Sequence, residues 1–176
     1  DDWIFLWTVQ NNANLRLAWV LHPATIYEDV ILFNFFGWNE FLWQGFGIIL
    51  RITASLAIAL MLWGLSNSRK IAIIGGLFFS VTFAALETVS WRSVHVATIV
   101  IILLSLGFYF LSSYIRGKDL KNYIASITFF CLSIISDPAR SFPSIIPVFM
   151  LIIGNWWILE DRSLKSVKKI FTDFLT

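Results

Sequence analysis

The stretch "EFLWQGFGIILRITASLAIALMLWGLS", residues 40–66, decides the class of this chain, because Glu40 and Arg51 are its only charged residues. A helix that crosses the hydrocarbon core of a bilayer needs about 20 mainly apolar residues. Further apolar runs lie at 94–115 and 141–159, with shorter runs at 71–86 and 122–135. The whole chain agrees, since 58% of its 176 residues are hydrophobic and its mean hydropathy is +0.77. The sequence predicts an all-α, polytopic transmembrane helix bundle of about five spans, with further helices in its outer-face loops.

The basic residues of the short loops predict the orientation of these spans, because Lys and Arg gather in cytoplasmic loops. Such loops are "SNSRK" (66–70), "IRGKDLK" (115–121) and the tail "EDRSLKSVKK" (160–169). The alternate loops, "ETVSWRSVH" (87–95) and "SDPARSFP" (136–143), hold one Arg each and fall on the outer face with residues 1–39. Single cysteines at Ser68 and Ser90 are therefore expected to label from the inside and the outside of the membrane, respectively.

These observations predict one transmembrane domain over residues 1–176, with an outer loop at 1–39, spans within 40–159 and a cytoplasmic tail at 160–176. Leu164, Val167, Phe171 and Phe174 recur at helical spacing, which favours an amphipathic helix on the membrane surface; a linker to further spans is the alternative. The expected location is the plasma (inner) membrane. Because no basic and apolar leader precedes Asp1, we expect a fragment that has lost a signal-anchor helix.

Charge and cysteine content exclude some classes of function. The net charge of +2 sits mainly in the predicted cytoplasmic loops, so it reports topology and gives no reason to expect a nucleic-acid partner. Cys131 is the single cysteine of the chain, which excludes an intrachain disulfide and a cysteine metal cluster. A divalent metal cofactor stays open.

Ionisable residues gather on the predicted outer face. They form four groups: Asp1 with Asp2; Arg16 with His22; Glu87 with Arg92 and His95; and Asp137 with Arg140. Each group alone is typical of a solvated interfacial pair or a turn. Together, acid, imidazole and guanidinium groups that face one cleft are what transfer from a phosphate-bearing donor requires.

Arg51 is different, because it lies roughly 16 Å along the predicted helix from Glu40. Two interpretations stay open: the helix begins in the outer aqueous layer and Arg51 reaches the headgroups, or Arg51 belongs to a binding site. In both, a guanidinium that faces hydrocarbon would cost several kcal/mol, so we expect it to face protein or an aqueous cleft.

The order of these landmarks resembles that of a known family. An acidic pair opens an outer loop, and "HPATIYEDVILFNFFGWNEFLWQGFGIILRITASLAIALMLW", "SRK", "GLFFSVTFAALETVSW" and "ATIVIILLSLGFYFL" follow in that order. This order resembles the polytopic glycosyltransferases of the C superfamily, and more closely their protein O-mannosyltransferase-like and tetratricopeptide-associated branch. "LETVSW" (86–91) is similar to a motif that closes a span in those proteins, whereas Arg51 stands where a His or a small polar residue is expected.

The resemblance implies an inverting transfer of a sugar from a polyprenyl-phosphate carrier to a hydroxyl or lipid acceptor on the outer face. It implies that Asp1 or Asp2, with Asp1 preferred, is the general base and that Glu87 orients a partner or a metal. Substrate-binding roles then fall to the basic residues, with Arg92 and Arg140 as phosphate clamps: Arg16, His22, Arg51, Arg92, His95 and Arg140. Asp1 or Asp2 should then lie within about 10 Å of Glu87 or Arg92.

A different class of function is also compatible with the sequence. A substrate-binding membrane subunit of a vitamin transporter would hold a small molecule in an outward cavity lined by Trp and polar side chains, and it would need no base. The oligomeric state stays open.

Overall fold

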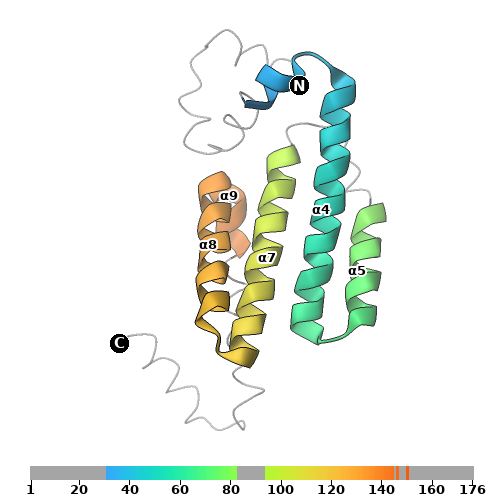
Figure 1. Cartoon of the computed structure of the whole chain (residues 1–176). Coiled ribbons are helices and arrows are strands. Elements are labelled where there is room, and N and C mark those ends of the chain that lie inside the picture. Colours follow the sequence, from blue (N-terminus) through green and yellow to red (C-terminus); the bar gives the residue numbers. More distant parts are fainter. Residues whose placement is uncertain (1–30, 83–93, 145, 147–149, 151–176) are drawn as a thin grey trace. The chain divides into compact units, whose positions relative to one another are not determined.

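The computed structural model describes residues 31–82, 94–144, 146 and 150 (Figure 1). The elements of this part of the chain are the helices α4 (Glu40–Ser66), α5 (Arg69–Val81), α7 (His95–Gly117), α8 (Leu120–Ser136) and α9 (Pro138–Ser141), and the 3-10 helix η2 (Phe142–Ser144). The all-α prediction is therefore confirmed for the described residues. The chain divides into two compact units after Ser141, and the helices α4 to α9 belong to the first unit.

The long helices of the first unit pack side by side: α4 runs antiparallel to α5 and parallel to α7, and α7 runs antiparallel to α8. α4 packs against both α5 and α7, α8 packs against α7, and α9 contacts α8 and α7 (Figure 1). The short connections at 67–68 and 118–119 reverse the chain direction, as expected for neighbouring antiparallel helices. These two turns meet at one end of the unit, where the Arg116 guanidinium donates to the Asn67 side chain at 3.4 Å. The first residues of α4 and α7 lie at the opposite end.

A tight corner sets the start of α4. Residues 31–36 are helical and end at Gly37, whose φ of +54° suits a residue without a side chain. The Asn39 side chain then accepts hydrogen bonds from the amides of Phe41 and Leu42, at 3.1 and 3.4 Å. Asparagine is among the best N-terminal caps because its carbonyl oxygen pairs with amides that lack an intrahelical partner. The helix consequently begins at Glu40, as the sequence predicted.

Small residues let the helices approach closely at several contacts. A β-carbon on Gly76 of α5 would lie 3.0 Å from both the Ala59 side chain and the Ser55 carbonyl oxygen of α4. Between α7 and α8, the buried Ser126 hydroxyl donates to the Gly107 carbonyl at 3.0 Å. Close backbone approach at Gly, Ala and Ser is the usual way in which helices associate inside membranes, where lipid removes the hydrophobic drive for helix packing.

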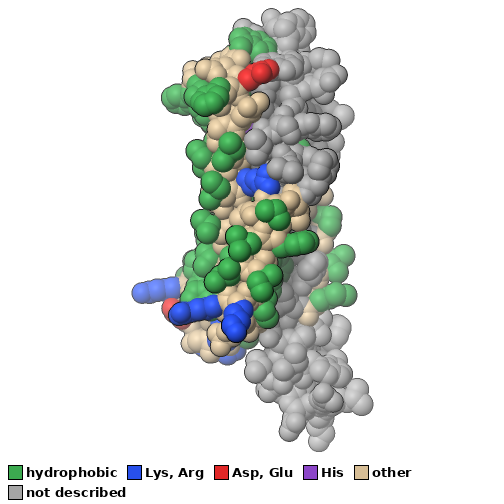
Figure 2. Space-filling view, turned by 90° about the vertical axis from the view of Figure 1, so that its right-hand side faces the viewer, with side chains coloured by type: hydrophobic (Ala, Val, Ile, Leu, Met, Phe, Trp, Pro, Cys, Tyr) green, Lys and Arg blue, Asp and Glu red, His purple; other side chains and the backbone are tan. Residues whose placement is uncertain are grey.

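Many large apolar side chains lie on the outside. Those on α4, α5 and α8 include Ile49 (61%), Leu56 (62%), Ile74 (67%), Phe78 (69%) and Ile135 (66%). Hydrophobic side chains are spread along the face of the unit shown in Figure 2. Among the described residues, α4 and α7 are long and apolar enough to cross a membrane.

Within the described residues, two helices meet the length requirement, fewer than the five spans expected of the whole chain. α4 and α7 match the predicted spans 40–66 and 94–115 closely. α8 covers the predicted run 122–135, but its 17 residues extend about 26 Å, short of the ~30 Å core of a bilayer. The predicted span 141–159 and the tail 160–176 lie mostly or wholly outside the described residues, as do residues 1–30 of the outer loop.

α5 is also shorter than the predicted run 71–86, because it ends at Val81. Its cap, Thr82, is extended, with φ −68° and ψ 147°. The hydroxyls of Ser80 and Thr82 donate to the carbonyls of Leu77 and Phe79, at 2.7 and 2.8 Å. Such local bonds offer the backbone an alternative to continuing a helix. A prediction from apolar residues alone takes no account of these hydrogen bonds, so the predicted run extends beyond the end of α5.

Candidate functional site

Three of the predicted site residues belong to the described part of the chain: Arg51, His95 and Arg140. The others lie outside the described residues: Asp1, Asp2, Arg16, His22, Glu87 and Arg92. The distance predicted between the acidic pair and Glu87 or Arg92 also involves only residues outside the described part, so it stays a prediction.

His95 is the first residue of α7 and is almost fully buried, with 1% of its surface exposed. The Trp43 ring stacks beside its imidazole at 6.3 Å, and the Phe46 ring meets it edge-on at 5.4 Å. Phe36 in turn packs edge-on against Trp43 at 5.3 Å, and the Trp43 indole donates to the Gly37 carbonyl at 3.0 Å. The imidazole is thus enclosed by aromatic rings where α4 and α7 begin.

Arg140 lies on α9, where a buried carboxylate holds it. Asp137 is fully buried and accepts from the Arg140 backbone amide at 3.1 Å and from its guanidinium at 2.6 Å. Asp followed by Pro is a common start of a helix. The Asp carboxylate accepts from the amide of the third helical residue, here Arg140, and Pro138 at the first helical position has no N–H that would need an acceptor. Ser141 then donates to the Ser133 carbonyl at 2.7 Å, which ties α9 to α8. The turn expected within 136–143 is therefore a short helix followed by η2.

Arg140 keeps a side that faces outward, with 44% of its side chain exposed. Because consecutive helices are antiparallel, the start of α7 with His95 and the end of α8 with Asp137 lie at the same end of the unit (Figure 1). The structure therefore brings two of the predicted outer groups to one end, opposite the basic turns. Among the described residues, no group of three or more His, Cys, Asp and Glu side chains is placed to hold a metal ion.

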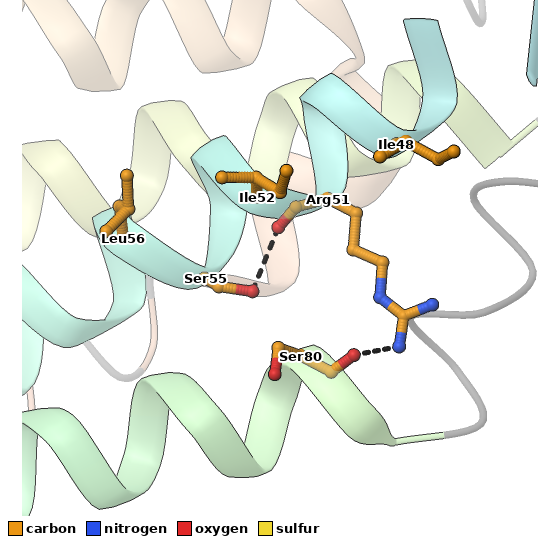
Figure 3. A pocket seen from close by; sticks show the side chains of 6 residues that line it. All are labelled: Ile48, Arg51, Ile52, Ser55, Leu56 and Ser80. Carbon is orange, nitrogen blue, oxygen red and sulfur yellow. Dashed lines mark hydrogen bonds between the residues drawn. The ribbon is translucent and has the colours of Figure 1, made fainter. Parts of the chain in front are cut away.

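Arg51 lies further along α4, and its guanidinium reaches across to the end of α5, where it donates to the Ser80 carbonyl (Figure 3). The last carbonyls of a helix lack intrahelical donors and carry a partial negative charge. The Arg51 guanidinium supplies both a hydrogen-bond donor for such a carbonyl and a positive charge beside the helix end, so Arg51 caps α5. The prediction that Arg51 faces protein is confirmed, and its contact with substrate stays a prediction.

A groove of about 390 Å³ opens beside this contact (Figure 3). Ile48, Ile52 and Leu56 follow one another at four-residue spacing and form its α4 wall, and Ser55, Ser80 and Arg51 complete the lining. The groove therefore combines an apolar wall with one cationic group. A guanidinium has five N–H donors and the bond to Ser80 uses one of them, so capping of α5 is compatible with donation to an anion in the groove.

Sequence reasoning missed the partners of these residues. Trp43 and Phe46, three positions apart on α4, share one face of the helix, and this spacing was the available signal for an aromatic enclosure. The Asp-Pro step at 137–138 was the available signal for a capped helix start that would engage Arg140. No local signal pairs Arg51 with Ser80, because that contact depends on how α4 and α5 pack.

The capping role of Arg51 leads to a testable expectation. Arg51→Met removes the donor to the Ser80 carbonyl while keeping an unbranched side chain, and an unsatisfied carbonyl in an apolar setting costs about 1–3 kcal/mol. We expect amide hydrogen exchange at the end of α5, in a peptide covering residues 76–82, to accelerate by about tenfold. Ile52→Met is the matched control, since Ile52 lines the same groove and its side chain has no polar group. Equal exchange rates in the two variants would contradict the capping role.

Comparisons with known proteins give no family for this chain. No protein-family model, curated protein or solved structure matches it.

Proposed function

We propose that this chain is the membrane-embedded part of a multi-pass glycosyltransferase. It takes a sugar from a polyprenyl-phosphate carrier and transfers it to a hydroxyl or lipid acceptor at the outer face of the plasma (inner) membrane. The observation that carries the proposal is the groove of Figure 3, because its apolar wall and its guanidinium suit the two halves of such a carrier, an isoprenoid chain and a phosphate.

Embedding in a membrane is supported by the distribution of side chains. Buried positions include many small and polar residues, such as Ala54, Ser105 and Ser133, whereas many Ile and Leu side chains are exposed. Only 22% of the most apolar window of α4 and 39% of that of α7 are buried inside the protein. The core helix of a soluble protein would be mostly buried, so this pattern favours helices whose outer faces contact lipid.

The chemistry assigned to the outer end follows from the charges that a sugar transfer develops. The base, Asp1 or Asp2, removes the acceptor proton while the acceptor oxygen bonds to the anomeric carbon and the bond to the phosphate oxygen breaks. Negative charge then grows on the departing polyprenyl phosphate. Guanidinium groups stabilise it best through paired N–H donors, which is the role proposed for Arg92 and Arg140. Asp137 would position Arg140 through the contacts described at α9.

The test of this proposal is a transfer assay with membranes that contain the full-length protein. A polyprenyl phosphate carrying a labelled sugar should lose its label to a hydroxyl or lipid acceptor, and a nucleotide sugar offered without the carrier should not serve as donor. Binding of the carrier or of another small molecule without any transfer would sink the enzyme proposal and support the non-enzymatic binding subunit of a transporter.

Cys131 tests the embedding without any substitution, because it is the single cysteine and lies exposed on α8. In a bilayer its thiol would face hydrocarbon, where the reactive thiolate does not form. We expect a water-soluble maleimide to label it at least about tenfold more slowly in vesicles opened on both faces than after SDS treatment. Lys70→Cys in a Cys131→Ser background should label rapidly in the same vesicles. Rapid labelling of Cys131 itself would show that α8 meets water and would contradict the embedding of this helix.

A further inference from the structure

The end of the first unit opposite His95 carries a cluster of cations. Arg69 and Lys70 follow the turn between α4 and α5, and Arg116, Lys118 and Lys121 surround the turn between α7 and α8. All of them are exposed. The Arg116 bond to Asn67 joins the two turns, and Figure 2 shows Lys and Arg side chains gathered at this end. We call these side chains the basic end.

Carboxylates of the described residues leave the basic end largely unbalanced. Its neighbouring carboxylate is Asp119, whose side chain caps α8 by accepting from the Lys121 amide at 3.1 Å. In the part of the chain that the structure describes, the cations of the basic end form no ion pair with a carboxylate. The first turns of α5 and α8 lie here beside the last turns of α4 and α7, so the partial charges of the helix ends offset one another and the Lys and Arg side chains set the sign. The cluster therefore presents a positive surface to any anion that can reach it.

Apolar side chains border the basic end along the sides of the helices. Ile71 is 50% exposed, Leu120 64% and Ile124 56%. The cations thus lie just beyond the last apolar turns, at the level where lipid headgroups meet the chain of a membrane-embedded helix. A free anion would engage the cations alone, whereas a lipid would engage both the cations and the apolar border.

We propose that the basic end is a binding surface for anionic phospholipid headgroups, with the lipid chains lying along Ile71, Leu120 and Ile124. Lys70, Lys118 and Lys121 supply point charges to headgroup phosphates at this surface, and Arg69 can pair with two oxygens of one of them. This inference rests on the proposed membrane embedding and does not depend on the proposed sugar transfer.

Spin-labelled lipids test the inference in the full-length protein, reconstituted in phosphatidylcholine vesicles with a trace of spin-labelled phosphatidylglycerol or phosphatidylcholine. We expect the protein-bound fraction to favour phosphatidylglycerol about fivefold, as one nearby cation contributes about 1 kcal/mol. Arg69→Gln, Lys70→Gln, Lys118→Gln and Lys121→Gln together should lower the preference to below about twofold. Arg116 is kept because its bond to Asn67 joins the turns. Two double variants cover the case in which the fourfold variant fails to fold. Each should lose part of the preference for phosphatidylglycerol: Arg69→Gln with Lys70→Gln, and Lys118→Gln with Lys121→Gln.

Controls separate charge, lipid and embedding. Lys70→Arg, Lys118→Arg and Lys121→Arg together conserve the charge and should keep the preference. Inorganic phosphate should compete no better than sodium chloride at equal ionic strength. A preference that survives neutralisation, or selective displacement by inorganic phosphate, would overturn the lipid surface. Failure of the protein to float with phosphatidylcholine vesicles would overturn the embedding on which it rests, whereas flotation without a lipid preference would overturn this inference alone.

Discussion

Replacing Asp1 and Asp2 together by asparagine is expected to lower sugar transfer by about 10²- to 10⁴-fold, the usual contribution of a positioned general base. Asparagine keeps the shape of the side chain but does not accept the acceptor's proton. Insertion into the membrane should be unchanged, because the substitution alters no apolar segment. The measurement is transfer from a labelled polyprenyl-phosphate sugar in membranes that hold equal amounts of each full-length variant.

Glu40→Gln is the matched control for this experiment. Glu40 is an exposed carboxylate in the first turn of α4, and it has no assigned role in the transfer. Its replacement should leave the rate unchanged. Arg92→Lys should lie between the control and the double variant, because the charge survives while the paired donors are lost. Full activity in Asp1→Asn and in Asp2→Asn would remove the catalytic assignment and favour the transporter-subunit alternative.

Gly76→Leu is expected to separate α5 from α4 and to destabilise the first unit by about 1–3 kcal/mol. A β-carbon at this position already lies 3.0 Å from the Ser55 carbonyl, and a backbone atom of a packed helix has little freedom to move aside. The larger Leu side chain forces the helices apart, which outweighs the gain of roughly 0.8 kcal/mol in helix propensity over glycine. Thermal unfolding in detergent measures the loss. The separation should also break the Arg51 bond to Ser80 and open the groove.

Gly45→Leu makes the same chemical change on α4 at a position where a β-carbon would meet no atom within 4 Å. It gains helix propensity without a clash, so its stability should equal or exceed that of the unchanged protein. The two variants should therefore differ in the sign of their effect. Equal destabilisation would mean that glycine itself, rather than the close approach of α4 and α5, matters at these positions.

The sequence predicted helices best where the apolar run is long. The predicted ends of the spans 40–66 and 94–115 fall within two residues of the observed ends of α4 and α7. The reason is that charged or polar residues flank both runs and that capping residues follow α4. The short run 71–86 was predicted less well, since hydroxyl groups of Ser80 and Thr82 end α5 within it. Apolar content says where a helix can lie in lipid, and local hydrogen bonds decide where it stops.

The candidate site was predicted as a list of residue types, and the structure adds their neighbours. His95 was expected on an outer surface, and it is instead enclosed by rings from α4. Arg140 was expected to clamp phosphate, and its guanidinium is anchored by the buried Asp137. Neither neighbour follows from the charge of the residue itself, since aromatic enclosure and buried pairing depend on which helix faces lie together.

By itself, the sequence determined the helical class, the positions of the long apolar helices and the gathering of Lys and Arg in alternate turns, because these features depend on composition and on short spacings along the chain. Only the tertiary structure decided that Arg51 caps α5, that Gly76 lies against Ser55, and that Asn67 and Arg116 join the two basic turns. The physical reason is that these contacts join residues on different helices. Their partners are set by the register and the close approach of the packed helices, which no short window of the sequence contains.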